Sequence, residues 1–183
     1  MKRLLTISIF VLASTLGFAQ YNHVQTAPNG TVIEQGQYNA DPGISPNDSK
    51  QTIAQKMAMV HKIGTWTYWY ESGAKLAEEQ YTNAGEPTGT WKSWHPNGQL
   101  SSEINHATGT AVYYFQNGAK AEEGTINANS ERTGNWKGWH ENGKLNYTGS
   151  WTSTGQKTGV WQFYDNNEQM IGTEHWNNGV MVN

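Results

Sequence analysis

The feature that most constrains the fold of this chain is one short sequence motif that recurs five times between Gly64 and Trp176. A second glycine follows nine positions after the opening one in the first four copies. Self-similarity at a short, nearly fixed period is typical of repeat architectures, in which each unit packs only on its neighbours. The opening glycines, spaced by 25, 20, 25 and 25 residues, are Gly64, Gly89, Gly109, Gly134 and Gly159.

Each copy predicts a β-hairpin. An aromatic stretch comes first, and aromatic and β-branched residues favour a strand. A turn pair and a more polar stretch follow. Asn-Gly accepts positive φ at both central residues, so it predicts a two-residue type I′ turn. The predicted fold class is all-β: an elongated antiparallel meander of tandem β-hairpin repeats with one short N-terminal helix. The turn pairs are Asn97-Gly98, Asn117-Gly118 and Asn142-Gly143, with Ser72-Gly73 and Asn167-Glu168 in the first and last copies.

A two-residue turn fixes which residues face each other across a hairpin. It places Trp136 opposite Gly149 and Tyr147 opposite Gly138, which pairs a large ring with a residue that has no side chain. It also places Lys92 opposite Glu103. Because side chains alternate along a strand, the register divides the aromatic residues between two faces. A packing face collects Trp66, Trp91, Trp136 and Trp161, and a more polar face collects Trp69, Trp94, Tyr114, Trp139 and Tyr164.

The phrase G-x-W-x-x-[WY]-x-x-N-G-x-L, as in residues 134–145, resembles the MORN repeat in its bacterial variant form. The resemblance covers roughly residues 64–179. It departs from the pattern at Ala111, where a tryptophan is expected, and at Glu168, where a glycine is expected. Such chains are often labelled as YwqK-like antitoxins. The resemblance implies an elongated antiparallel meander that is used for binding, and it implies no catalytic residues.

Residues 1–19 have the composition of a signal peptide. Lys2 and Arg3 form a basic start, an apolar run follows, and small residues at −3 and −1 predict cleavage after Ala19. The alternatives are a buried N-terminal helix and a membrane anchor. The apolar run is too short for a transmembrane segment, and nothing later in the chain is apolar enough to be one. The chain has no cysteine, so a soluble periplasmic or secreted product is favoured over a lipoprotein.

The segment between this leader and the five copies predicts two further parts. Residues 20–38 read as a partial N-terminal repeat, because Asn29-Gly30 is followed by a glycine and an aromatic at the offsets seen in later copies. Residues 39–63 read as an insertion with a short amphipathic helix, and residues 64–183 hold the five repeats. Ser45 is the predicted N-cap of that helix. A partner-binding helix is the alternative to one that covers the sheet, and its apolar stripe is Ile53, Met57 and Val60.

The sequence predicts no catalytic residue, no metal site and no cofactor. His95 and His140 occupy the same position in copies two and four. Two hairpins separate them by about 19 Å, so they cannot bind one metal ion. A column of glutamates at 78, 103 and 123 is spaced by about 10 Å, just beyond the separation of the two carboxylates in an inverting glycosidase, and it reads as a solvated face. The net charge of −3 is spread evenly, which argues against a nucleic-acid partner.

The favoured function is an exported interaction module that presents its polar aromatic face to a protein. One alternative is a module that binds cell-surface polysaccharide or choline-type ligands, because regularly spaced rings can stack on sugars or hold quaternary ammonium groups. A second alternative is an antitoxin of a toxin–antitoxin pair. Loss of Trp94 and Trp139 should weaken binding, whereas loss of Trp91 and Trp136 should unfold the array.

The leader gives a first testable prediction. We expect the mature protein to begin at Gln20 and to be recovered outside the cytoplasm, because the leader has the basic, apolar and small-residue regions of a cleavable signal. N-terminal mass spectrometry of the protein from its native host measures this. Recovery of a chain that retains residues 1–19 would contradict the prediction.

Overall fold

A computed structural model describes residues 20–182 of the chain, so the predicted signal peptide lies outside the described residues. The chain forms two compact units, and the division falls between Gly89 and Thr90. In both units the strand order is the chain order, and the paired strands are antiparallel. The predicted all-β meander of tandem hairpins with one short helix is confirmed.

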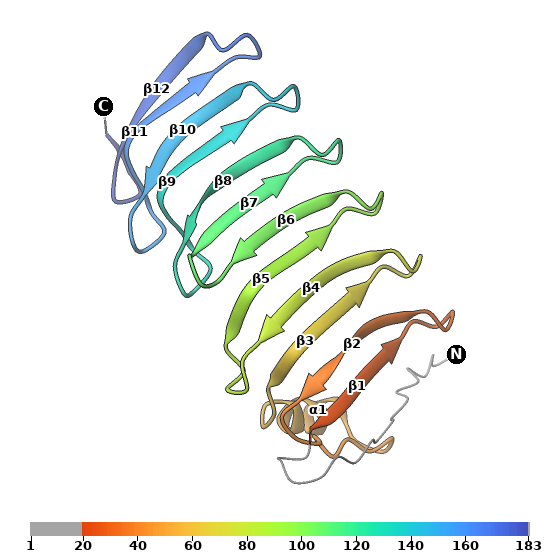
Figure 1. Ribbon diagram of the computed structural model, residues 1–183. Coiled ribbons are helices and arrows are strands. Elements are labelled where there is room, and N and C mark those ends of the chain that lie inside the picture. The colour runs from red at the N-terminus through yellow and green to blue at the C-terminus, as the bar shows by residue number, and fades with distance from the viewer. Residues whose placement is uncertain (1–19, 183) are drawn as a thin grey trace. The chain divides into compact units, whose positions relative to one another are not determined.

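The first unit contains two complete hairpins and the helix (Figure 1). The insertion separates the two hairpins in sequence, yet their inner strands β2 and β3 pair directly. The elements are β1 (Tyr21–Thr26), β2 (Val32–Tyr38), α1 (Lys50–Met57), β3 (Lys62–Trp69) and β4 (Lys75–Tyr81).

The second unit holds the remaining hairpins, and it begins within β5 (Pro87–Trp94). Its second and third strands are six and five residues long, shorter than the seven or eight residues of the strands that follow up to β12, which accounts for the 20-residue copy. The other elements are β6 (Leu100–Asn105), β7 (Thr110–Tyr114), β8 (Lys120–Ile126), β9 (Arg132–Trp139), β10 (Leu145–Trp151), β11 (Lys157–Tyr164), β12 (Met170–Asn177) and β13 (Val180–Val182).

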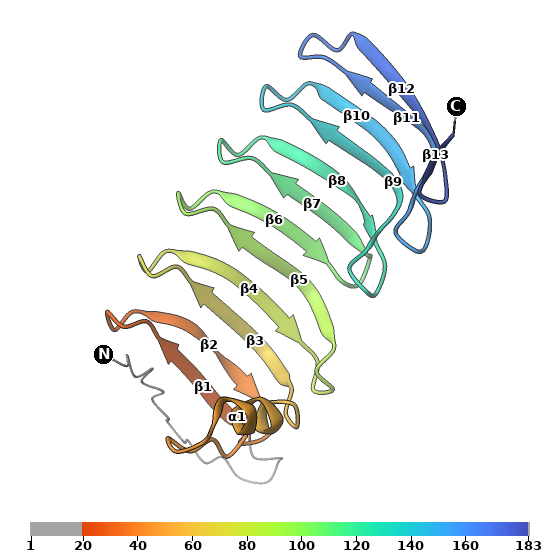
Figure 2. The same cartoon turned by 180° about the vertical axis from the view of Figure 1, so that it is seen from behind.

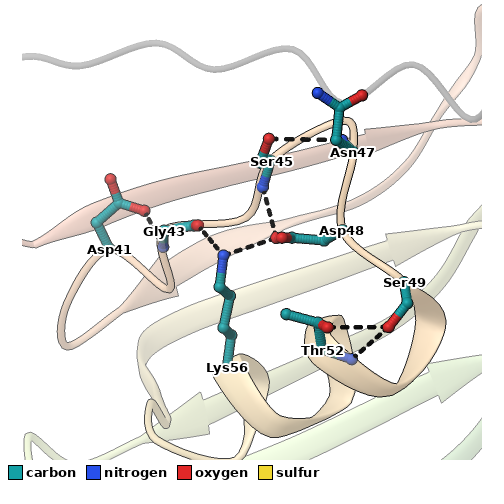
Figure 3. A network of polar contacts seen from close by, with 8 residues as sticks. All are labelled: Asp41, Gly43, Ser45, Asn47, Asp48, Ser49, Thr52 and Lys56. Atoms are coloured by element: carbon teal, nitrogen blue, oxygen red, sulfur yellow. Dashed lines mark hydrogen bonds and ion pairs between the residues drawn. The ribbon is translucent and has the colours of Figure 1, made fainter.

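The helix begins four residues later than predicted. Ser49 is its N-cap, and the Ser49 Oγ accepts a hydrogen bond of 3.1 Å from the Thr52 backbone N. Ser45 is not the cap, because its own N–H donates to Asp48 Oδ2 at 2.8 Å and closes a turn ahead of the helix. Lys56 Nζ links this turn to α1 by donating to Gly43 O and to Asp48 Oδ2, both at 2.7 Å (Figure 3). This hydrogen bond from Lys56 is the main cause of the lowered pKa of Asp48.

The insertion is closed at its base. Asn39 N donates to His61 O, and His61 N donates to Asn39 Oδ1 at 2.9 Å, so the chain leaves and rejoins the sheet at one place. Figure 2 shows α1 beside the ends of β1 and β2. No residue of α1 is buried, so polar contacts hold it more than its apolar stripe does. Within residues 20–182, no helix is long and apolar enough to span a membrane.

The hairpin turns differ from the predicted type I′. In the hairpin of β9 and β10, His140 N donates to Lys144 O and Gly143 N donates to His140 O, both at 2.8 Å. Gly143 has a φ of +80°, whereas Asn142 has a negative φ. This is a three-residue loop, a type I turn followed by a left-handed glycine, so the predicted turn type is wrong for these copies. The same arrangement occurs at Gly30, Gly73, Gly98 and Gly118.

The predicted register is nevertheless confirmed, because a bulge compensates for the longer turn. Leu145 pairs with Trp139, and one residue is then skipped so that Tyr147 pairs with Gly138. Beyond this bulge Trp136 pairs with Gly149, as predicted. Lys92 likewise pairs with Glu103.

The turn asparagine links one hairpin to the next. Asn142 Oδ1 accepts from Lys144 N at 3.1 Å within its own turn, and Asn142 Nδ2 donates to Asn166 O of the following hairpin at 3.2 Å. This position therefore needs a side chain with both an acceptor and a donor. That need explains why asparagine occurs here although its φ is not positive. We call these residues the clamped asparagines: Asn29, Asn97, Asn117 and Asn142.

The core is a tryptophan laid over a glycine of the preceding hairpin. A Cβ atom on Gly124 would lie 2.3 Å from the Trp136 ring, so only glycine leaves room for it. The Trp136 Nε1 donates to Thr125 O at 3.0 Å, beside that glycine. The ring that covers Gly149 is that of Trp161, so the prediction that Trp136 packs there was wrong, although the strand pairing was right.

The same arrangement recurs in three hairpins. Trp66, Trp136 and Trp161 are 0%, 0% and 3% exposed, and the glycines beneath them are Gly36, Gly124 and Gly149. Each indole N–H donates to the carbonyl of the residue after its glycine.

Ala111 departs from the tryptophan pattern, and its partner strand compensates. Ala111 pairs with Ile104, which takes the slot that glycine fills in other copies. A small residue over a large one fills the volume of a large ring over a glycine. Ala111 is fully buried, and it joins Ile126 and Trp136 in one cluster.

The last copy gives a prediction about strain. Glu168 replaces the turn glycine and takes its left-handed conformation with a φ of 62°. A residue with a Cβ atom costs about 1–2 kcal/mol there. We therefore expect Glu168→Gly to stabilise the fold by about 0.5–1 kcal/mol after the entropic cost of glycine. The midpoint of urea unfolding measures the change.

The matched control is Gly143→Ala, which places a side chain in the equivalent turn and should lower the same midpoint. An unchanged or lowered midpoint for Glu168→Gly would show that this turn is not strained.

Candidate functional site

The predicted binding aromatics each end the first strand of a hairpin. Trp69 ends β3 in the first unit, and the other four end β5, β7, β9 and β11 in the second unit. All five are partly buried, so they are neither core residues nor fully exposed. In the second unit they recur on every other strand, roughly 10 Å apart. We call this group the aromatic band: Trp94, Tyr114, Trp139 and Tyr164.

A row of side chains, polar at every position except Val112, runs beside the aromatic band on the same face. Its members are direct cross-strand partners, so each lies next to the one before it. Cross-strand neighbours of opposite charge stabilise a sheet. We call this the polar row: Lys92, Glu103, Val112, Glu123, Lys137, Thr148 and Gln162.

The charges of the polar row are joined to the aromatic band. Lys92 Nζ lies 3.0 Å from Glu103 Oε1, and Tyr114 OH donates to Glu103 Oε2 at 3.0 Å. The hydrogen bond from Lys92 is the main cause of the lowered pKa of Glu103, and the Tyr114 hydroxyl contributes. Burial, and then the bond to Glu103, raises the pKa of Tyr114. Glu103 therefore stays ionised and holds the Tyr114 ring in place.

A second charged pair supports Trp139. Lys120 Nζ lies 2.6 Å from Glu123 Oε2 and 5.2 Å from the centroid of the Trp139 ring. In the first unit Lys75 pairs with Glu78 at 2.9 Å in the same way. The glutamate column noted in the sequence is therefore made of lysine-paired carboxylates. A face whose charges are paired in this way suits a ligand with little net charge.

The same face carries a depression of about 330 Å³. The backbone of Ala111 and Gly124 lines its floor, because the side-chain positions of these two residues lie on the opposite face of the sheet. Hydroxyl, amide and charged groups surround it. The lining residues are Thr110, Val112, Glu123, Thr125, Asn135 and Lys137.

The opposite face carries cations that the sequence analysis missed. Arg132 lies 4.1 Å from the Trp136 ring and makes an ion pair with Glu122. Tyr147 OH donates to Glu122 as well, and burial, followed by this bond, raises the pKa of Tyr147. A cation four residues before the buried tryptophan was the available signal. It recurs as Lys62 before Trp66 and Lys157 before Trp161, at 4.6 and 4.3 Å from the rings.

The two histidines that share a slot form hydrogen bonds between hairpins. His95 Nε2 donates to Tyr114 O at 2.8 Å, and His140 Nε2 donates to Tyr164 O at 2.9 Å. Each bond joins one turn to the end of the next aromatic strand. Among the described residues, no group of histidines and carboxylates is placed to hold a metal ion.

Hairpins joined by tryptophan, asparagine and histidine contacts define a β-hairpin repeat protein. The family model described as MORN repeat variant matches residues 62–83, 87–107, 132–152 and 157–178. The chain is a MORN-repeat protein of this variant type. The copy that carries Ala111 lies between two of the matched ranges. No curated protein matches the chain in the comparison.

Replacing a tryptophan by alanine should cost much more stability on the packing face than on the polar face. Trp136→Ala should destabilise the fold by about 3–5 kcal/mol, because it empties the fully buried space above Gly124. Trp139→Ala should cost only about 1 kcal/mol, since its ring is partly exposed. Chemical unfolding followed by circular dichroism compares the two variants. Equal losses of stability would contradict the division into a packing face and a polar face.

Proposed function

We propose that this chain is an exported, non-catalytic interaction module that binds a protein partner with the aromatic band and the polar row. Trp69 presents an equivalent surface in the first unit. The observation that carries the proposal is the contrast between the two faces of one sheet. On one face Trp66, Trp136 and Trp161 are buried over glycines, and on the other every ring of the aromatic band stays partly exposed.

The chemistry of the face supports a protein partner. Protein interfaces are enriched in tryptophan and tyrosine, with polar groups at the rim. Trp94, Tyr114 and Trp139 supply the rings, and paired lysines and glutamates flank them. The rings lie on a hydrogen-bonded sheet, Glu103 accepts a hydrogen bond from the Tyr114 hydroxyl, and Lys120 lies over the Trp139 ring. Binding therefore costs little side-chain ordering.

A cell-surface polysaccharide is the second candidate. The observation that favours it is the regular step of roughly 10 Å between rings, beside hydroxyl, amide and carboxylate groups. Sugars present an apolar face that stacks on rings and hydroxyls that bond to such groups. The paired charges of the face suit a neutral glycan as well as a protein.

A pull-down from the envelope and medium fractions of the host tests the proposal. We expect one discrete protein to be retained by the wild-type chain and lost, or weakened at least about tenfold, with the double variant Trp94→Ala and Trp139→Ala. The control is Trp176→Ala, which removes a ring of the same size from the opposite face and should keep the partner.

Other outcomes would point elsewhere. Retention by the double variant, or equal loss with Trp176→Ala, would overturn the assignment of the binding face. Specific binding to insoluble polysaccharide with no retained protein would favour the second candidate. If the retained protein is a toxin that the chain neutralises, the chain is an antitoxin.

A further inference from the structure

The chain contains five Asn-Gly pairs, at residues 29–30, 97–98, 117–118, 142–143 and 178–179. Asparagine followed by glycine is the dipeptide most open to spontaneous deamidation, because glycine has no side chain to block the attack of its backbone nitrogen on the asparagine carboxamide. All five pairs have the same two residues. Any difference in reactivity between them in the folded protein must therefore come from the structure.

Four of the pairs contain the clamped asparagines. In each, Oδ1 accepts from the backbone N two residues ahead at 2.9–3.1 Å. In each, Nδ2 donates to a backbone carbonyl of the next hairpin at 2.8–3.2 Å. Both ends of the carboxamide are thus held away from the following glycine nitrogen. Attack requires these two hydrogen bonds to break first.

Asn178 lies in a different turn. It joins β12 to β13 as a two-residue turn, with φ values of 47° at Asn178 and 82° at Gly179, and Asn177 pairs with Val180 across it. This is the type I′ turn that the sequence predicted for the other copies. The Asn178 side chain is exposed and makes no hydrogen bond to any residue within 20–182, whereas Gly179 N donates to Lys157 O at 2.9 Å. The glycine nitrogens of the other four pairs also donate to a backbone carbonyl, so the free carboxamide is what distinguishes Asn178.

The hairpin that carries Asn178 is also the least anchored. β13 is three residues long, and its three partners are all on β12. Its side chains Val180, Met181 and Val182 are 64%, 52% and 43% exposed. A short strand with little buried surface opens at low cost in free energy, and opening frees the backbone around Asn178 for the reaction.

We propose that Asn178 is the deamidation site of the folded protein and that the four clamped asparagines are protected. The Gly179 backbone nitrogen attacks Cγ of Asn178 and gives up its proton. The side-chain nitrogen takes a proton and leaves as ammonia, which produces a cyclic imide. Water then opens the imide to aspartate or isoaspartate, so the reaction needs no oxidant and no cofactor.

The aspartate product would have different structural effects at a clamped asparagine and at Asn178. At a clamped site, a carboxylate would replace the Nδ2 donor and its oxygens would face a neighbouring carbonyl oxygen. This would remove a link between hairpins and leave two acceptors in contact. The Asn178 side chain makes no such link, so a new negative charge there faces solvent.

Peptide mapping of the wild-type protein after incubation in mildly alkaline buffer tests the proposal. Aspartate and isoaspartate products are separated and quantified for each of the five pairs. We expect the peptide with Asn178 to react at least about tenfold faster than the other four, since each of those must first break two hydrogen bonds. In denaturant, where no clamp exists, the five rates should converge.

The variant Asn178→Ser is the control, because it removes the carboxamide at the turn tip. It should abolish the fast reaction and leave the slow rates of the clamped asparagines unchanged. Equal rates at all five pairs in the folded protein would overturn the proposal. So would a clamped asparagine that reacts faster than Asn178, or a fast reaction that persists in the variant.

Discussion

The fold depends on one contact, a tryptophan ring that lies on the bare backbone of a glycine in the preceding hairpin. Gly124 and Trp136 show its logic, because a Cβ on the glycine would lie inside the ring. A hairpin alone cannot bury such a ring, since nothing covers its faces. The contact therefore links neighbouring repeats and not the two strands of one repeat. The indole N–H and the cation over the ring, Arg132 for Trp136, complete the same unit.

This arrangement uses one face of the sheet and leaves the other available. On the packing face Glu122 pairs with Arg132 and accepts a hydrogen bond from the Tyr147 hydroxyl. On the polar face Trp94 and Trp139 contribute less to the core and retain exposed surface. The alternation of side chains along each strand thus separates the buried rings from the partly exposed ones. The proposed binding role rests on this separation.

The departures from the repeat phrase follow the same physics. Ala111 stands where other copies have a tryptophan, and its partner Ile104 fills the space that a glycine leaves empty in those copies. Glu168 stands where other copies have the turn glycine, and it takes the left-handed conformation that this turn requires. The clamped asparagines and the histidines at 95 and 140 add hydrogen bonds at the turn side. The array is therefore held by stacked rings across the strands and by polar links between turns.

The sequence by itself determined the hairpins, their register and the two faces, because periodic glycines and the alternation of side chains are local properties. It found the aromatic band for the same reason. Only the tertiary structure decided the rest. It placed Trp161 over Gly149, because the partner of a ring in the next hairpin depends on stacking and not on pairing within one hairpin. It showed that the recurring turn asparagine, as at Asn142, links neighbouring turns, whereas the positive φ falls on Gly143. A bulge absorbed the extra turn residue, and so a wrong turn type gave the right register.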